Sequence, residues 1–233
     1  MFSRTSTNRL THHDLARFTG PSLFAALGRA VCEAACLPRK ELFEAWEMAR
    51  RVRRRFRGGR VVDLAGGHGL LAQAMLLLDD SSPSAVVVDV ALPPSSMRLH
   101  ASLVAAWPRL KDRITFVPSD LESVAVAADD LIVSCHACGR LTDRVLERAL
   151  SARARVAVLP CCHDVADAPA LLDAWMDPAL ALDVNRAHRL VAAGYDVWTR
   201  QIPADVTPKN RLLLAAPRVG YCGPPSRSAP PAR

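Results

Sequence analysis

A glycine-dense turn within residues 61–72, VVDLAGGHGLLA, has the composition best suited to ligand binding in this chain. An apolar run ends at Asp63, and Gly67 and Gly69 allow the backbone to approach a ligand closely because neither carries a Cβ atom. The residues that follow read as a helix start, whose free N–H groups and positive dipole end favour anionic or polar ligand groups. Such a turn at the carboxyl end of a parallel strand is where open α/β sheets bind nucleotides.

Two acids in the next apolar segments extend this nucleotide hypothesis. Asp89 ends the second apolar run, twenty positions after Gly69, and its carboxylate can accept hydrogen bonds from both ribose hydroxyls. Asp120 ends the third run, where a capping role in the following loop is the alternative. The spacing Gly67-x-Gly69-x-x-Ala72 also fits the dinucleotide fingerprint of NAD enzymes, so these residues indicate a nucleoside without choosing the cofactor.

The fourth and fifth apolar runs end in two segments rich in cysteine and histidine, at residues 134–139 (SCHACG) and 159–163 (LPCCH). The carboxyl ends of neighbouring parallel strands face the same crevice, so we expect these side chains to converge there. His136 is the best general-base candidate and His163 the second.

A zinc site is the alternative interpretation of the same segments. Cys135 and Cys138, together with Cys161, Cys162 or His163, have the ligand types of a tetrahedral zinc site. A C-x-x-C motif across a strand end is not the usual zinc knuckle, and we therefore predict no metal.

The elements that must position these residues alternate between strand and helix. Apolar Val/Ile/Leu runs typical of strands buried on both faces occur at 61–65, 85–92, 114–121, 130–137 and 155–162. Helical patterns lie between them at 69–78, 96–106 and 142–152. This alternation predicts an α/β fold with a doubly wound parallel sheet.

The chain departs from the alternation at both ends. After a helix at 181–194, strands at 195–203 and 210–217 are joined by a short connection, which forces them to be antiparallel. At the other end, residues 22–36 and 39–57 have helical spacing. We therefore divide the chain into a flexible basic N-terminus (1–21), a helical extension (22–57), the main domain (58–217) and a disordered tail rich in Pro, Gly and Ser (218–233).

The pattern over residues 61–217 resembles class I S-adenosylmethionine-dependent methyltransferases, whose first motif is an acid followed by alternating glycines and whose mostly parallel sheet ends in an antiparallel hairpin. The resemblance implies a Rossmann-like sheet of seven strands and S-adenosylmethionine as cofactor. Here Ala65 stands where the family has its first glycine. The cofactor-binding residues that the resemblance implies, together with the ribose candidate, are Asp63, Ala65, Gly67, Gly69, Asp89, Asp120, Leu121 and Ser134.

A second resemblance concerns the side of the crevice where a methyl acceptor would enter. The pattern His-x-Cys-Gly with Thr142-Asp143, then Cys-Cys-His one strand later, is similar to a methyltransferase family that includes tRNA ribose 2′-O-methyltransferases. It implies that the acceptor side is formed by His136, Cys138, Cys161, Cys162 and His163. The zinc-binding segments of the tRNA enzymes have no counterpart, because residues 1–57 contain only Cys32 and Cys36. The acceptor is thus unidentified, with tRNA or another RNA as the candidate.

Composition limits the class of protein. The net charge is +7, which suits a polyanionic partner, and the Arg-rich run at 50–57 predicts either a solvated helix face or a phosphate-contacting surface. A second basic cluster at 207–211 fits either a tight turn or an anion-binding group. Seven cysteines without an apolar leader favour reduced thiols in the cytoplasm, and the absence of an uninterrupted apolar 18-mer argues against a membrane span.

The sequence therefore predicts a cytoplasmic S-adenosylmethionine-dependent methyltransferase with an unidentified acceptor. Two alternatives remain open. One is an NAD-dependent oxidoreductase that uses the same turn, and the other is a non-catalytic RNA-binding protein with a methyltransferase-like fold.

Overall fold

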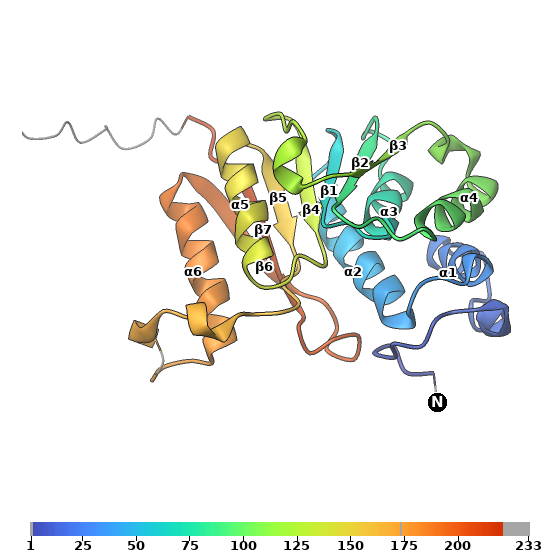
Figure 1. Ribbon diagram of the computed structural model, residues 1–233, viewed down its shortest axis with the longest axis horizontal. Coiled ribbons are helices and arrows are strands. Elements are labelled where there is room, and N and C mark those ends of the chain that lie inside the picture. Colours follow the sequence, from blue (N-terminus) through green and yellow to red (C-terminus); the bar gives the residue numbers. More distant parts are fainter. Residues whose placement is uncertain (1, 173, 221–233) are drawn as a thin grey trace, which may run out of the picture.

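Seven strands form one sheet in the order β3-β2-β1-β4-β5-β7-β6 in the computed structural model, which describes residues 2–172 and 174–220 (Figure 1). The strands are β1 (Val61–Leu64), β2 (Ala85–Asp89), β3 (Ile114–Pro118), β4 (Leu131–Ser134), β5 (Arg155–Val158), β6 (Tyr195–Gln201) and β7 (Arg211–Pro217). The first five are parallel, whereas β7 pairs antiparallel with both β5 and β6. This confirms the predicted α/β Rossmann-like fold with a terminal antiparallel hairpin.

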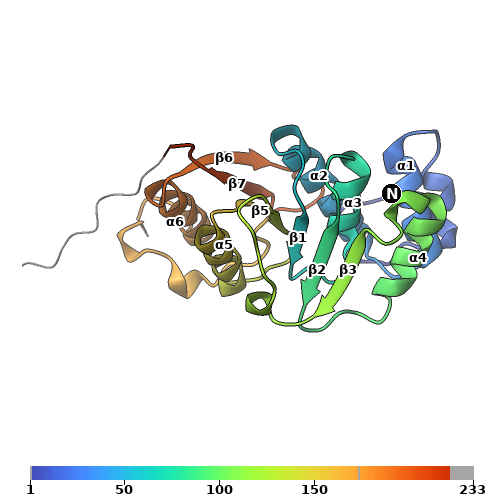
Figure 2. The same cartoon turned by 90° about the horizontal axis from the view of Figure 1, so that it is seen from above.

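Helices cover both faces of the sheet (Figure 2). They are α1 (Leu23–Ala34), α2 (Arg39–Arg55), α3 (Leu70–Leu78), α4 (Ser96–Ala106), α5 (Arg140–Ala152) and α6 (Pro178–Ala192). Buried side chains from α1 to α4 form one core with one face of the sheet, and those from α5 and α6 form a second core with the other face. Successive residues contribute to opposite cores, as Val61 and Val62 do in β1.

The strand order places a topological switch at β1. Chain connections run from β1 outward through β2 to β3, and then return to β4 on the other side of β1. Crevices at the carboxyl ends of the strands form at such a point in open α/β sheets. The register pairs Val62 with Val86 on one side and with Ile132 on the other, so the three strands end at the same edge.

Several strands end earlier than the apolar runs predict. β4 ends at Ser134 and β5 at Val158, so the cysteine- and histidine-rich segments lie in loops beyond the strands. The backbone of these loops is free to turn, and consecutive side chains need not alternate between the two faces as they do in a strand. Because these segments are loops, the sulfur atoms of Cys161 and Cys162 can lie on the same side of the chain.

The N-terminal segment requires a correction, because residues 2–20 are not a loose extension. Leu10 is fully buried and Phe18 is nearly so, and Arg9 forms an isolated bridge with Pro38. Ring contacts of Phe2 with Phe18 and Phe43 join this segment to α2. The apolar side chains in an otherwise polar segment therefore dock it onto the helical layer. Most of the tail predicted to be disordered, residues 221–233, lies outside the described residues.

Within the described part of the chain, none of the helices combines the length and the apolar character needed to cross a membrane.

Candidate functional site

A cavity of about 570 Å³ opens at the carboxyl ends of β1, β2 and β4. This volume is within the range of about 300 to 1,000 Å³ of small-molecule and cofactor sites. The residues that line the cavity are Leu37, Glu41, Ala45, Asp63, Ala65, Gly66, Gly67, His68, Leu70, Leu71, Val88, Asp89, Val90, Ser119, Asp120, Leu121, Cys135, His136, Leu141 and Arg144. The cavity therefore joins the predicted nucleotide residues to the predicted acceptor residue His136.

The glycine turn after β1 forms one wall. A Cβ atom at Gly69 would stand 2.8 Å from the Phe116 ring and 2.9 Å from Val87, so this glycine lies packed against the sheet. At Gly67, by contrast, no described atom lies within 4 Å of the position that a Cβ would take. Both have positive φ angles, of 50° at Gly67 and 72° at Gly69. Gly69 thus allows the turn to pack closely against the sheet, and Gly67 leaves space beside the backbone for a ligand.

Asp89 is fixed at the end of β2 by two backbone groups. Its Oδ2 accepts a hydrogen bond of 3.0 Å from the Gly67 N–H, and its Oδ1 accepts one of 3.0 Å from the Ala91 N–H. A carboxylate has about four lone-pair sites, so two remain for a ligand. This arrangement fits the predicted contact with two vicinal hydroxyls.

Asp63 lies buried beneath the turn, with 1% of its surface exposed. Its Oδ2 accepts a hydrogen bond of 3.1 Å from the Ala72 N–H in the first turn of α3. Burial, and to a smaller degree the negative charge of Asp89, raises the pKa of Asp63 to about 7. A cation bound in the cavity would lower this pKa again and would itself be stabilised.

Ala65 occupies a conformation that L-residues avoid. Its φ angle is 56°, in the left-handed region, and its side chain lines the cavity. Residue 65 itself thus keeps the left-handed backbone, while the neighbouring Gly66 is packed against Val87 and the Asp63 side chain. The strain of a Cβ in this region is on the order of 1 kcal/mol.

The other predicted cofactor residues differ in position. Asp120 caps the short 3-10 helix Leu121–Ser123 by accepting from the Glu122 N–H, and it also forms an ion pair of 2.8 Å with Arg144. Leu121 is buried and lines the cavity. Ser134 is buried at the end of β4 outside the described lining, and its Oγ finds no hydrogen-bond partner within residues 2–172 and 174–220.

His136 and Cys135 line the part of the cavity next to Glu44 of α2. His136 is half-buried, and ligand atoms of His136, Cys135 and Glu44 lie within 4.8 Å of one another. Burial, followed by the positive charge of Lys40, lowers the pKa of His136 to about 4. The imidazole is therefore neutral at physiological pH and able to accept a proton from a bound group.

Helix α2 contributes residues to this part of the cavity that the sequence interpretation did not include. Glu41 lines the cavity, and burial raises its pKa. Lys40 forms an ion pair of 3.4 Å with the buried Glu44. The helical pattern of 39–57 predicts an apolar face, but only tertiary packing reveals which polar residues of its first turns reach the cavity.

His68, in the glycine turn after β1, also lines the cavity and was not among the predicted site residues. It shares a hydrogen bond of 2.9 Å with the Ser95 hydroxyl.

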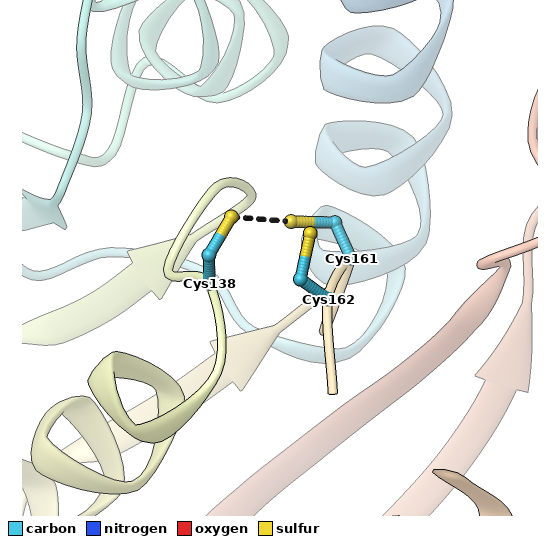
Figure 3. A group of neighbouring side chains, drawn as sticks. All are labelled: Cys138, Cys161 and Cys162. Atoms are coloured by element: carbon cyan, nitrogen blue, oxygen red, sulfur yellow. Dashed lines mark hydrogen bonds between the residues drawn. The ribbon is translucent and has the colours of Figure 1, made fainter. Parts of the chain in front are cut away.

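Three thiols gather in the loops that follow β4 and β5, as Figure 3 shows. The Sγ atoms of Cys138, Cys161 and Cys162 lie within 4.8 Å of one another, and those of Cys138 and Cys161 are 3.2 Å apart. A loop-to-loop hydrogen bond of 3.0 Å from the Gly139 N–H to the Cys162 carbonyl fixes their spacing. The structure thus brings together three of the predicted acceptor-side residues, next to the cavity rather than in its described lining.

His163 does not join the predicted convergence. Its side chain is 2% exposed and shares a hydrogen bond of 2.9 Å with Asp183 of α6. Asp183 also pairs with Arg186 and Arg211, at 3.1 and 2.6 Å. Because the chain turns after Cys162, the imidazole faces this ion-pair network and not the cavity. The expected catalytic position of His163 beside His136 is therefore corrected.

Both basic segments combine internal contacts with exposed cations, such as Arg54 in α2 and Lys209 in the hairpin. In α2, Arg53 is buried against Asp79, with an ion pair of 3.1 Å, and Arg55 stacks over the Trp198 ring at 3.7 Å. Arg51 donates a hydrogen bond of 2.8 Å to the Gln201 carbonyl. In the hairpin, Asn210 donates to the Ile202 carbonyl and closes the turn. Much of the basic character of these segments serves internal contacts.

Comparison with known proteins places this geometry in context. A family model described as “Methyltransferase domain” matches residues 41–168, more than half of the chain and all of the cavity's strands. No curated protein matches the sequence.

The fold is similar to that of several solved structures. The ribosomal protein L11 methylase from Lactobacillus delbrueckii subsp. bulgaricus is 15% identical with a TM-score of 0.50, over 77% of this chain and 79% of that chain. The mitomycin 7-O-methyltransferase MmcR is 20% identical with a TM-score of 0.51, over 89% of this chain and 63% of that chain. The pyocyanin biosynthetic protein PhzM is 20% identical with a TM-score of 0.52, over 89% of this chain and 62% of that chain. This chain thus spans less than two thirds of the last two, and the similarity concerns the fold.

Proposed function

The chain belongs to the methyltransferase-domain family, and we propose that it transfers the methyl group of S-adenosylmethionine to an acceptor that enters the cavity beside His136. The observation that carries the proposal is the pair of carboxylates, Asp63 and Asp89, on the wall of the cavity. Within the described residues, neither forms an ion pair with a cationic side chain. A cavity with two such carboxylates favours a cationic, hydroxyl-bearing ligand.

Three features support the fit of S-adenosylmethionine. Asp89 has two lone-pair sites left for ribose hydroxyls, and the space beside Gly67 accommodates a ligand against the backbone. Asp63, with its raised pKa, lies where a positive charge would be favoured. Bound S-adenosylmethionine would supply an electrophilic methyl group on a sulfonium cation.

The chain's own contribution to the reaction is orientation and proton acceptance. Holding two reactants in line can contribute several kcal/mol to lowering the barrier. Neutral His136 would accept the proton that a hydroxyl, amine or thiol acceptor loses. The apolar Leu37 and Leu141 also line the cavity and offer apolar surface to a bound group.

The acceptor stays a prediction. The net charge of +7 supports RNA, whereas the internal contacts of Arg51, Arg53 and Arg55 reduce the basic surface available to it. Among the structural neighbours, one is named for a ribosomal protein and another for mitomycin, so the shared fold does not choose between acceptors.

Titration calorimetry with S-adenosylhomocysteine tests the cofactor assignment. We expect one site in the wild type and at least about tenfold weaker binding in Asp89→Ala, because hydrogen bonds to a charged group contribute about 1.5 to 3 kcal/mol each. Asp196→Ala, which removes an exposed carboxylate on β6, is the matched control and should bind normally. Folded wild-type protein that binds NADH but not S-adenosylhomocysteine would instead support the oxidoreductase alternative.

The acceptor class is identified by incubation with labelled methyl donor. Total RNA, protein extract and a metabolite pool are each supplied to the wild type and to His136→Ala. Label that enters one pool with the wild type only would identify the class. RNA that is bound but never labelled would support the non-catalytic alternative.

A further inference from the structure

The three thiols of Cys138, Cys161 and Cys162 have a geometry that the methyl-transfer proposal does not use. Figure 3 shows the Cys138 sulfur, from the loop before α5, directed toward the two sulfurs of the loop after β5. Consecutive cysteines in a strand would point to opposite faces, but β5 ends at Val158, and the loop turns both sulfurs to the same side. We propose that Cys138, Cys161 and Cys162 bind a zinc ion and leave its fourth coordination position open.

The distances agree with tetrahedral coordination. Zinc–sulfur bonds of about 2.3 Å in a tetrahedron hold the sulfurs about 3.8 Å apart. The Sγ atoms of Cys138 and Cys161 are 3.2 Å apart, and all three lie within 4.8 Å of one another. Shifts of about 1 Å or less in the sulfur positions, produced by rotation of the side chains, would reach this spacing. Cys138 and Cys162 are exposed, which leaves room for such rotation. A disulfide would need about 2.05 Å, so the present spacing is that of separate thiols.

The chemistry of the cluster favours zinc over hard divalent cations. Thiolates are soft ligands that select zinc or copper(I) and discriminate against magnesium and calcium. Metal binding deprotonates the coordinating thiols, and a divalent cation compensates the negative charges that three neighbouring thiolates would bring together.

The loops that carry the thiols are held from outside the cluster. The Gly139 N–H donates to the Cys162 carbonyl, and the buried Arg186 donates to the Gly139 carbonyl at 3.1 Å. Arg186 is in turn fixed by Asp143 and Asp183. Such supporting contacts orient metal ligands in established sites. This support distinguishes the cluster from three cysteines that meet by chance on a surface.

The three proposed zinc ligands differ from the ligand set that the sequence suggested. Cys135 belongs instead to the buried group with Glu44 and His136, and His163 faces Asp183. Three protein ligands with an exchangeable fourth position are the pattern of catalytic rather than structural zinc sites. His136, two residues before Cys138, lines the cavity, so the open position lies close to the proposed acceptor end.

Cobalt(II) is the spectroscopic probe for this site. The full chain is stripped of metal, kept reduced with a phosphine, and titrated with Co²⁺. We expect one equivalent to bind with near-ultraviolet thiolate-to-cobalt absorption and the visible bands of tetrahedral cobalt, both removed by Zn²⁺. Cys138→Ser and Cys162→Ser change exposed residues and should fold normally. Each substitution should reduce the thiolate absorption by about one third and weaken cobalt binding at least about tenfold. Losing a residue that only supports a metal ligand already costs about 10- to 100-fold in affinity, so losing a ligand itself should cost at least the lower value.

Three control variants make the assignment specific. Cys32→Ala, buried in α1, and Cys135→Ser, in the cavity wall, should leave the spectrum unchanged. Cys222→Ser changes a residue outside the described part of the chain and should also have no effect. Loss of thiolate absorption in Cys135→Ser or Cys222→Ser, or no thiolate absorption in the wild type, would overturn the proposal.

The open position has its own readout. Addition of 2-mercaptoethanol to the cobalt-loaded protein should add one further thiolate absorption while cobalt stays bound. Unchanged bands would show a closed site with a fourth protein ligand. These measurements do not depend on methyl transfer, so failure to bind S-adenosylhomocysteine and failure to bind cobalt are separate results.

Discussion

The carboxylate of Asp89 and the backbone N–H of Gly67 form a hydrogen bond of 3.0 Å that ties the end of β2 to the turn after β1. The bond orients the acid and also brings the most open part of the glycine turn beside it. Among the described residues no cationic side chain pairs with Asp89, so its carboxylate is available to a ligand. The two residues therefore form one preorganised binding element from two neighbouring strands.

Alanine substitutions at the two glycines of this turn should separate binding from stability. In Gly67→Ala the new Cβ projects into open space, so we expect a stability loss of roughly 1 to 2 kcal/mol from left-handed strain. The methyl group also occupies ligand space, and S-adenosylhomocysteine binding should fall strongly. In Gly69→Ala the same strain is joined by overlap with Phe116 and Val87, so the stability loss should be larger. Urea denaturation and calorimetry on both variants measure the stability losses and the binding. Equal stability losses in the two variants would contradict the prediction.

Replacing Asp63 by asparagine should increase stability at alkaline pH. The pKa of Asp63 is about 7 in the folded protein, above the value of about 3.9 expected for an unfolded chain. A raised carboxyl pKa favours folding fully below pH 3.9, and this contribution is lost as pH rises through 7. At about 1.4 kcal/mol per pKa unit, Asp63→Asn should gain as much as about 4 kcal/mol at pH 8 and little at pH 4. Urea denaturation at both pH values checks the sign, and a gain larger at pH 4 would contradict it.

The same substitution should remove a pH dependence of cofactor binding. A cationic ligand favours ionised Asp63, so the affinity of the wild type for S-adenosylmethionine should rise between pH 6 and pH 8 as the carboxyl with a pKa of about 7 ionises. Asp63→Asn should bind more weakly with a flat profile. A flat wild-type profile would show that the cation does not lie near this residue.

His136→Ala should impair turnover without impairing cofactor binding. General-base assistance contributes about 10²- to 10⁴-fold, and kcat should fall within that range. With a pKa of about 4, His136 is neutral above pH 5, so the wild-type kcat should decline only in strong acid. His188→Ala, an exposed histidine of α6, is the matched control. Full turnover in His136→Ala with the identified acceptor would remove this residue from the mechanism.

Ala65→Gly should stabilise the protein modestly. Removing the Cβ from a residue with a φ of 56° relieves about 1 to 2 kcal/mol of strain, and the greater freedom of glycine in the unfolded chain offsets about 0.4 to 1 kcal/mol. A net gain of roughly 0.5 to 1 kcal/mol is expected in urea denaturation. A net loss would show that the Ala65 methyl makes packing contacts that exceed its strain.

Local patterns determine most of the fold, and the sequence predicts it well for that reason. Buried Val-rich runs and the helices between them specify the parallel sheet, and the short connection before Arg211 requires an antiparallel hairpin. The strand order also explains why the residues after β1, β2 and β4 share one cavity. The positions of Asp63, Gly67 and Asp89 follow directly from strand ends.

Side-chain directions in the loops could not be obtained in this way. Cys161, Cys162 and His163 are consecutive, yet the two sulfurs meet Cys138 and the imidazole turns to Asp183. The direction depends on where β5 ends and on a hydrogen bond with Asp183 of α6, twenty residues away in sequence. The contribution of Glu41 likewise depends on how α2 packs, which its own periodicity does not encode.

The position of β7 has a consequence for synthesis of the protein on the ribosome. In the described sheet, β6 pairs only with β7, and β7 also covers the outer side of β5. A growing chain that has emerged only to residue 210 therefore exposes an unpaired edge on β5 and holds β6 without a partner. Translation must pass residues 211–217 before this half of the sheet can close, so a stop codon shortly before Arg211 would leave an edge prone to aggregation.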